Sequence, residues 1–267
     1  MKKLSIFAAT CAAIVFAACG GNKSANNTAE ADSLKSFEQQ QIEANIKMQF
    51  DSIAAQFAQL KQPAFLTEKN GGITLSKEEK QVKPDYLLGA DAAENATTLA
   101  EKYRILSALS VDKKIAELYE MPTDEYDKAI SKLVADINDP SFKVLDNPGT
   151  IFETSTALYN AMNDNGRINY FWQLAAAALV EELYIVNQNA DKFLSTFDDK
   201  AADNITYRIV LLLDAINRLT EFDPEIMPVA KALSPLDVLN ATSVAELKNQ
   251  LSQAKADITA AREALIK

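Results

Sequence analysis

The chain has no histidine and little cysteine or glycine. Its 267 residues include two cysteines and 7 glycines. Without histidine, the sequence contains no Ser-His or Cys-His nucleophile pair and no Glu-x-x-His ligands of a helical di-iron bundle. Gly20-Gly21 lies in a polar N-terminal stretch, and Gly71-Gly72 lacks the Lys-Ser/Thr that follows in a phosphate-binding loop. The sequence therefore predicts no catalytic, cofactor-binding or metal-binding residue, and no cofactor.

Both cysteines lie close to the N-terminus. Met1-Lys2-Lys3 is a short cationic segment, and residues 4–18 form an uncharged apolar run. This pattern predicts a secretory signal peptide over residues 1–18, because the run is short for a membrane span. Cys11 leaves with that signal. The folded body then contains no thiol, no disulfide and no cysteine-based metal site.

The residues around Cys19 indicate how the signal ends. Ala17-Ala18-Cys19-Gly20-Gly21 resembles the lipobox of bacterial lipoproteins, although Phe16 stands where leucine is usual. The resemblance implies that Cys19 is acylated and becomes the new N-terminus. The alternative is a nearby cut by the ordinary signal peptidase, which leaves Cys19 as a free thiol. Residues 19–32 are small and polar, which predicts a lipidated flexible tether ahead of a folded body over residues 33–267.

The body is acidic. Removal of Lys2 and Lys3 with the signal changes the formal net charge from −10 to −12. Such a body repels phosphate backbones and anionic headgroups, so we expect no nucleic-acid partner and membrane contact through the lipid anchor. In lipoproteins like those of Bacteroidota, an acidic cluster soon after the cysteine favours surface display. Here the first acid after Cys19 is Glu30, so no such early cluster is present. That resemblance implies an outer-membrane anchor facing the periplasm, with surface exposure as the alternative.

Apolar residues recur at helical spacing through most of the body, with almost no period-two alternation. We therefore expect an all-α fold, a multi-helix bundle with long amphipathic helices at its N- and C-terminal ends. The first of these helices carries Ile46, Phe50, Ile53, Phe57 and Leu60 on one face. The last carries Val244, Leu247, Leu251, Ala254, Ile258, Ala261 and Leu265. These heptad seams either pack within the body or form a coiled-coil surface for a partner.

Residues 168–186, INYFWQLAAAALVEELYIV, are the most apolar part of the body and predict its buried central helix. Two adjacent acids within the run argue against a membrane span. Further helices are expected at 91–119, as one helix or two joined near Asp112, and at 123–137, 152–162 and 204–219. Two prolines and a glycine predict a hinge at 138–149, and Pro224, Pro228 and Pro235 divide the chain before the last helix.

Glu182 is the candidate functional carboxylate. Helical geometry places it on the apolar face with Leu179, whereas Glu181 falls on the side of Gln173. Burial there would raise the pKa of Glu182, which suggests a proton donor or a ligand contact inside the bundle. The alternative is a buried ion pair with one of three arginines: Arg104, Arg208 or Arg218. Trp172, Tyr170 and Tyr184 likewise either line a sugar or peptide groove or pack in the core.

The segments CGGNK, KPDYLL, AEKYRILSALSVDKKIAELYEMP and LVEELYIV occur in that order. Together they resemble a group of Bacteroidota lipoproteins of unknown function, which implies an anchored, helical, periplasm-exposed protein. We expect a non-enzymatic binding or scaffolding module of the cell envelope, with an envelope protein or glycan as partner. One alternative is a carboxylate-dependent enzyme acting on glycans, which needs a cleft with two acids about 5–10 Å apart. Another is a carrier that holds a small apolar ligand in an enclosed cavity.

Overall fold

The computed structural model describes residues 48–57, 60, 72–145 and 155–266. The chain divides into two units, Met1–Lys47 and Met48–Lys267, and the described residues all belong to the second. The predicted signal peptide, the tether, Cys19 and the first turns of the N-terminal helix therefore lie outside the described residues.

The described part of the second unit is helical and contains no strand, which confirms the predicted all-α multi-helix bundle. Residues 48–57 form a helical segment. The α-helices that follow are α3 (Lys77–Gln81), α4 (Ala92–Asn95), α5 (Leu99–Leu118), α6 (Asp124–Ile137), α7 (Ser155–Asp164), α8 (Ile168–Gln188), α9 (Ala190–Phe193), α10 (Asp199–Leu219), α11 (Met227–Leu233), α12 (Val244–Gln253) and α13 (Lys255–Ile266). The 3-10 helices among the described residues are η2 (Pro140–Val144), η4 (Leu194–Thr196), η5 (Pro224–Ile226) and η6 (Ser234–Val238).

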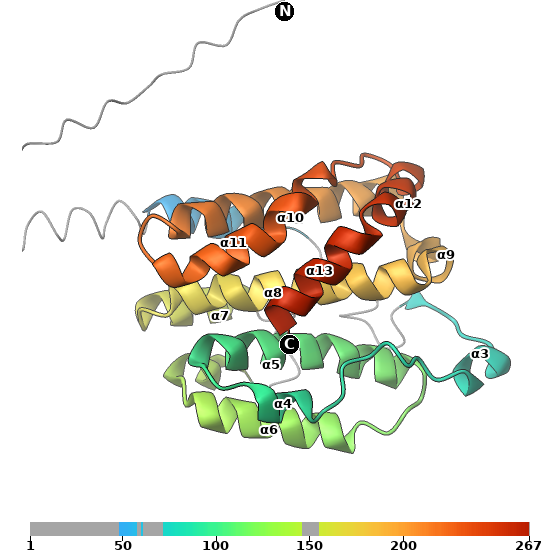
Figure 1. Cartoon of the computed structure of the whole chain (residues 1–267), viewed down its shortest axis with the longest axis horizontal. Helices are drawn as coiled ribbons and strands as arrows, with labels where there is room; N and C mark the ends of the chain where they lie inside the picture. Colours follow the sequence, from blue (N-terminus) through green and yellow to red (C-terminus); the bar gives the residue numbers. More distant parts are fainter. Residues whose placement is uncertain (1–47, 58–59, 61–71, 146–154, 267) are drawn as a thin grey trace, which may run out of the picture. The chain divides into compact units, whose positions relative to one another are not determined.

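Helix α8 is the centre of this unit. Figure 1 shows it between α5 and α6 on one side and α10 and α11 on the other, with α13 crossing in front. Its contacts with α5 are the most extensive between any two of the described elements, and α13 packs on both. Buried residues lie on all sides of α8, and most of them are apolar, which is typical of a buried helix. Ala176 and Ala177 are fully buried and let neighbouring helices approach closely. The predicted central helix is thus confirmed.

The two seams at the ends of the body pack inside it. Phe50, Ile53 and Phe57 are buried, and the rings of Phe50 and Phe57 contact Trp172 of α8. In the C-terminal seam Leu247 and every later position are buried. The expected single C-terminal helix is divided at Ala254 into α12 and α13. For the described positions, the intramolecular interpretation is correct and the coiled-coil partner surface is wrong.

The region 91–119 forms two helices, but their junction is not near Asp112 as the sequence suggested. The chain leaves α4 at Ala96, and α5 begins after Thr98, whose hydroxyl accepts a hydrogen bond from the Glu101 amide. The Glu101 carboxylate accepts from the Thr97 and Thr98 amides in return, and these bonds lower the pKa of Glu101 to about 2. Asp112 lies within an unbroken α5, and its carboxylate accepts a hydrogen bond from the Leu88 amide, which belongs to another segment.

Prolines mark the other interruptions as predicted. Pro224, Pro228 and Pro235 lie in the first turns of η5, α11 and η6, where a missing amide hydrogen costs no helical bond. Of the proposed hinge at 138–149, residues 138–145 are described: Asn138 adopts a left-handed conformation after α6 (φ 49°), and η2 follows.

Within the part of the chain that the structure covers, no helix has the length and apolar character to span a membrane.

Candidate functional site

Glu182 lies in the core and forms an ion pair. Its side chain on α8 is 0% exposed, and both of its carboxylate oxygens accept from Arg208 Nη1, at 3.1 and 2.9 Å. Arg208 on α10 is 2% exposed, and its guanidinium lies 6.0 Å from the centre of the Phe57 ring. Burial raises the pKa of Glu182, and the Arg208 charge opposes that rise. Of the alternatives that the sequence left open, the structure shows the buried ion pair with Arg208.

Glu181 is also buried, although helical geometry had placed it on the more polar side of α8. Its carboxylate accepts from Arg262 Nε at 2.6 Å and from Arg262 Nη2 at 2.8 Å. Arg262 comes from α13, lies 4.1 Å from the Tyr184 ring centre and donates to the Tyr86 carbonyl. The polar side of α8 is therefore covered by α13, the last helix of the chain. Tyr184, which is half-buried, packs against this arginine.

A second acid shares this buried site. Asp112 of α5 is fully buried, and its Oδ2 accepts from the Leu88 amide at 2.9 Å. Its Oδ1 has no hydrogen-bond partner among the described residues. Burial, and then the nearby Glu181 charge, raise the pKa of Asp112 well above its usual value. Burial also raises the pKa of Glu181, against the opposing effect of Arg262. One arginine thus faces two carboxyl groups, an arrangement that favours a proton on Asp112.

The aromatic residues of α8 occupy two different environments. Trp172 is fully buried, with Phe50, Phe57, Tyr159 and Phe171 around its ring. Packing is therefore its role. Tyr170 stacks on Tyr103, with ring centres 4.7 Å apart and an interplanar angle of 13°. Tyr170 also lines an open pocket, so the expectation of an aromatic binding wall remains for this residue.

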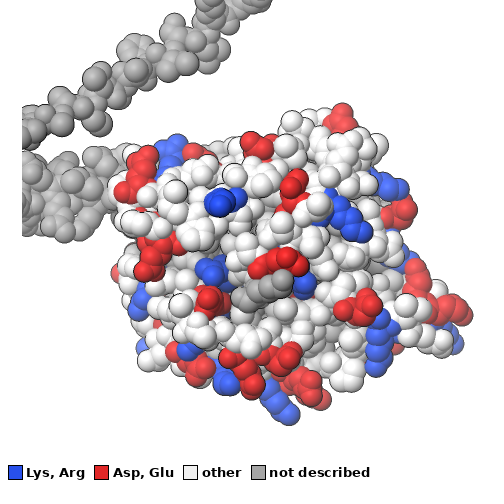
Figure 2. All heavy atoms as spheres, viewed as in Figure 1, with Lys and Arg blue, Asp and Glu red and all other residues white. Residues whose placement is uncertain are grey.

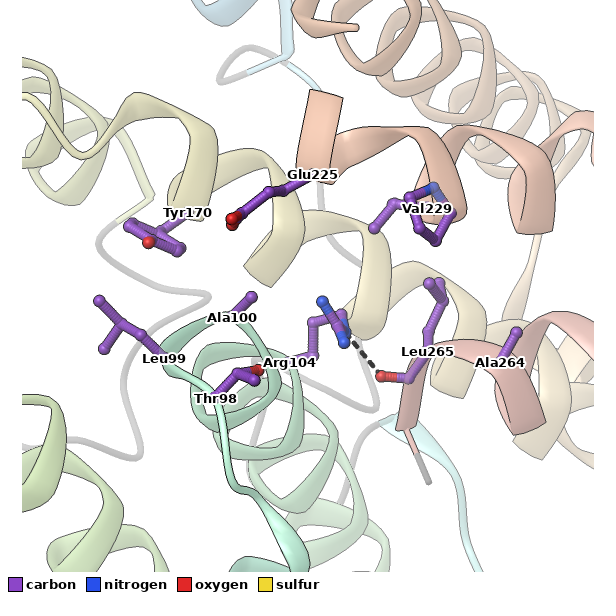
Figure 3. Close-up of a pocket in the computed structure, with 10 residues that line it drawn as sticks. Thr98, Leu99, Ala100, Arg104, Tyr170, Glu225, Val229, Ala264 and Leu265 are labelled. Carbon is purple, nitrogen blue, oxygen red and sulfur yellow. Dashed lines mark hydrogen bonds between the residues drawn. The ribbon is translucent and has the colours of Figure 1, made fainter. Parts of the chain in front are cut away.

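The pocket lies where α5, α11 and α13 meet, and its volume is about 290 Å³. Figure 3 shows its walls: the start of α5 below, η5 and α11 above, and the end of α13 to one side. The lining residues are Thr98, Leu99, Ala100, Arg104, Tyr170, Glu225, Pro228, Val229, Ala264 and Leu265. Glu225 is the single carboxylate among them. The pocket is thus mainly aliphatic, with one cationic and one anionic side chain.

Arg104 is the main polar feature of this pocket. Its Nε donates to the Leu265 carbonyl at 2.8 Å, and its Nη1 donates to Gln173 Oε1 at 2.5 Å. Both acceptors are neutral, and burial lowers the pKa of this guanidinium. Within the described part of the chain, no carboxylate forms an ion pair with Arg104, whereas Arg208, Arg218 and Arg262 each have one. Arg104 is thus held in place by neutral acceptors, and the charge of Glu101, one turn earlier, acts on it without a direct ion pair.

From the sequence, Arg104 was expected only as a possible partner for Glu182, and no role was expected for Glu225. The two come together through contacts between segments distant along the chain, since Leu265 lies 161 residues from Arg104. Periodicity alone could not show that the two residues line the same pocket.

The described residues contain no group of three or more acidic, cysteine or histidine side chains that could hold a metal ion.

Figure 2 shows acidic and basic side chains interspersed over the face of the molecule that carries α13. The negative charge on this face is therefore not collected in one patch.

Comparison with known proteins identifies no relative: no family model matches the chain, and no curated protein or solved structure is significantly similar to it.

Proposed function

We propose that the chain is a lipid-anchored protein of the cell envelope whose helical body is a non-enzymatic binding module. The anchor is a lipid on Cys19, attached to the outer membrane with the body facing the periplasm. The short apolar run after Lys2-Lys3 and the Ala-Ala-Cys-Gly-Gly sequence support the anchor. The partner expected is an envelope protein or glycan, contacted by the body.

The observation that supports the binding role is a difference in ion pairing: two carboxylates of the core are each paired with an arginine, whereas the arginine of the pocket is not in an ion pair among the described residues. The core carboxylates Glu181 and Glu182 are both held by arginines, Arg262 and Arg208. Neither carboxylate lines the pocket, so neither can touch a ligand bound there. The pocket instead presents Arg104, held by neutral acceptors and without a direct ion pair among the described residues, next to aliphatic side chains. A preorganised charge in an apolar recess is typical of a site that binds and orients a ligand.

The two alternatives fit this geometry less well. A glycan-cleaving enzyme of the common kind needs two carboxyl groups about 5–10 Å apart across its substrate. The pocket is lined by one, Glu225. A carrier of an apolar ligand needs an enclosed apolar cavity, whereas this pocket contains an arginine and a glutamate.

The test is crosslinking and affinity capture of the lipidated protein from its native envelope, compared with a Cys19→Ala form. We expect the native form to fractionate with the outer membrane, to carry acyl chains on Cys19 by mass spectrometry, and to recover a defined envelope component. The Cys19→Ala form should lose the lipid and the membrane fractionation while its purified body stays folded. An unmodified Cys19 in native protein would overturn the anchor. Glycan turnover by the purified body, with no partner recovered, would overturn the binding role.

A further inference from the structure

We infer that the pocket between α5, α11 and α13 binds a small zwitterion of the amino-acid type: a carboxylate held by Arg104, an ammonium group held by Glu225 and a short aliphatic part between the helices. This inference rests on the proposed binding function and names the class of ligand that the site would take.

Arg104 supplies the carboxylate site. Its two hydrogen bonds to Leu265 and Gln173 use Nε and Nη1, and among the described residues no acceptor is bonded to Nη2. The Glu101 carboxylate, one turn earlier, accepts from the amides of Thr97 and Thr98, and its charge acts on Arg104 without a direct ion pair. A guanidinium oriented by neutral acceptors loses little conformational freedom when it binds a carboxylate. Partial burial strengthens the attraction relative to a solvent-exposed arginine.

Glu225 supplies the opposite charge on the facing wall. It is exposed, and its backbone amide donates to Asp223 Oδ1 at 3.0 Å, which caps η5. Asp223 in turn accepts from Asn169 of α8 at 2.9 Å, which links η5 to the central helix. Figure 3 shows Glu225 and Arg104 entering the pocket from different elements, with Tyr170 on the Glu225 side. No ion pair joins these two side chains, which both belong to the described part of the chain. A ligand that carries both charges can satisfy each of them, whereas a simple anion would face the Glu225 carboxylate.

The remaining walls determine the size and character of the ligand. Leu99, Ala100, Val229 and Leu265 give an aliphatic lining. The volume of about 290 Å³ lies just below the usual range for small-molecule sites, about 300–1,000 Å³, so the ligand must be small. A compact ligand with a branched aliphatic group fits these limits, and leucine is the simplest probe that has all three features.

The experiment is isothermal titration calorimetry on the purified, lipidated protein in detergent, with three probes. L-Leucine carries both charges, isovalerate carries only the carboxylate, and isoamylamine carries only the ammonium group. We expect leucine to bind more tightly than either half-probe by about tenfold or more, because each half loses one charge-assisted hydrogen bond. Arg104→Gln should weaken leucine and isovalerate binding by a similar factor. Glu225→Gln should weaken leucine and isoamylamine binding and leave isovalerate no weaker.

Glu221→Gln is the matched control, because Glu221 is exposed nearby on the chain and does not line the pocket. It should leave all three affinities unchanged. Glu225→Gln alters an exposed side chain, so its result does not depend on whether Arg104→Gln folds. If isovalerate binds as tightly as leucine, or if Glu225→Gln leaves leucine binding unchanged, the zwitterion inference is wrong. If no probe binds, the inference fails as well, while partner capture from the envelope tests the binding role separately.

Discussion

At the scale of single residues, the buried acids differ in how their charge is compensated. Glu182 has its own arginine, Arg208, whereas Asp112 and Glu181 face Arg262 together. An ion in a protein interior is costly unless it is paired. Among Asp112, Glu181 and Arg262, the acid that has no ion pair therefore takes up a proton. Asp112, with one oxygen lacking a hydrogen-bond partner among the described residues, is that member.

This arrangement predicts a particular pH dependence of stability. The folded-state pKa of Asp112 is raised above its unfolded value. Its contribution to stability is therefore complete below the unfolded pKa and is lost as the pH rises through the folded pKa. In Asp112→Asn that loss should be absent. Near pH 8 we expect the variant to be more stable than the wild type by about 1–3 kcal/mol, the usual cost of an unsatisfied buried polar group.

Urea unfolding near pH 5 and near pH 8 measures this effect. The wild type should lose stability between the two pH values, and Asp112→Asn should lose less. Asp136→Asn, an exposed substitution on α6, is the control and should follow the wild type. An Asp112→Asn protein that is less stable than the wild type at both pH values would show that the carboxylate is needed in its charged form.

At the scale of elements, buried ion pairs tie the outer helices to α8. Glu182 and Arg208 join α8 to α10, and Glu181 and Arg262 join α8 to α13. Each pair adds little net stability compared with apolar packing, but removal of one partner leaves a buried charge alone. These pairs therefore fix which side of α10 and which side of α13 face the centre.

Arg208→Met should destabilise the fold by about 3–5 kcal/mol, because it leaves Glu182 buried without a counter-charge. The double variant Glu182→Met/Arg208→Met should recover most of that loss. Arg218→Met provides a control on the same helix, because the Arg218–Asp214 pair is 42% and 43% exposed and should contribute less than about 1 kcal/mol. Equilibrium denaturation of the four proteins gives the coupling energy. A single variant as mild as Arg218→Met would contradict the importance of the buried pair.

Local pattern predicted the elements better than their junctions. The spacing of apolar residues predicted α8, α10 and the C-terminal seam, because one continuous buried face leaves a clear period in the sequence. The junction before Thr98 was missed, since it depends on a reciprocal cap rather than on apolar spacing. The burial of Glu181 was missed for a different reason: its cover, α13, lies some eighty residues later (separation 81 to Arg262). The pocket pair Arg104 and Glu225 leaves no local signal either.

At the scale of the whole described unit, the difference in burial between α8 and α3 predicts which helix opens last and which opens first. Nearly every residue of α8 from Phe171 to Val186 is buried, whereas α3 has no buried residue. Amides in a central packed helix exchange only when the fold opens globally, whereas those in an exposed short helix exchange by local fraying.

Hydrogen–deuterium exchange with mass spectrometry should therefore show α8 peptides among the slowest to exchange and α3 peptides exchanging early. Peptides from α5 should resemble those from α8, because the two helices share the largest contact in the unit. Equal protection of α3 and α8 would contradict the central role of α8.

The walls of the pocket have a consequence for biogenesis. Its lining runs from Thr98, which caps α5, to Leu265 on α13, and the carbonyl of Leu265 also orients Arg104. A polypeptide leaves the ribosome N-terminus first, so one wall of the recess is synthesised long before the other. A nascent chain that ends before α13 lacks this wall of the pocket, so the ligand binding that we infer requires that α13 has been synthesised.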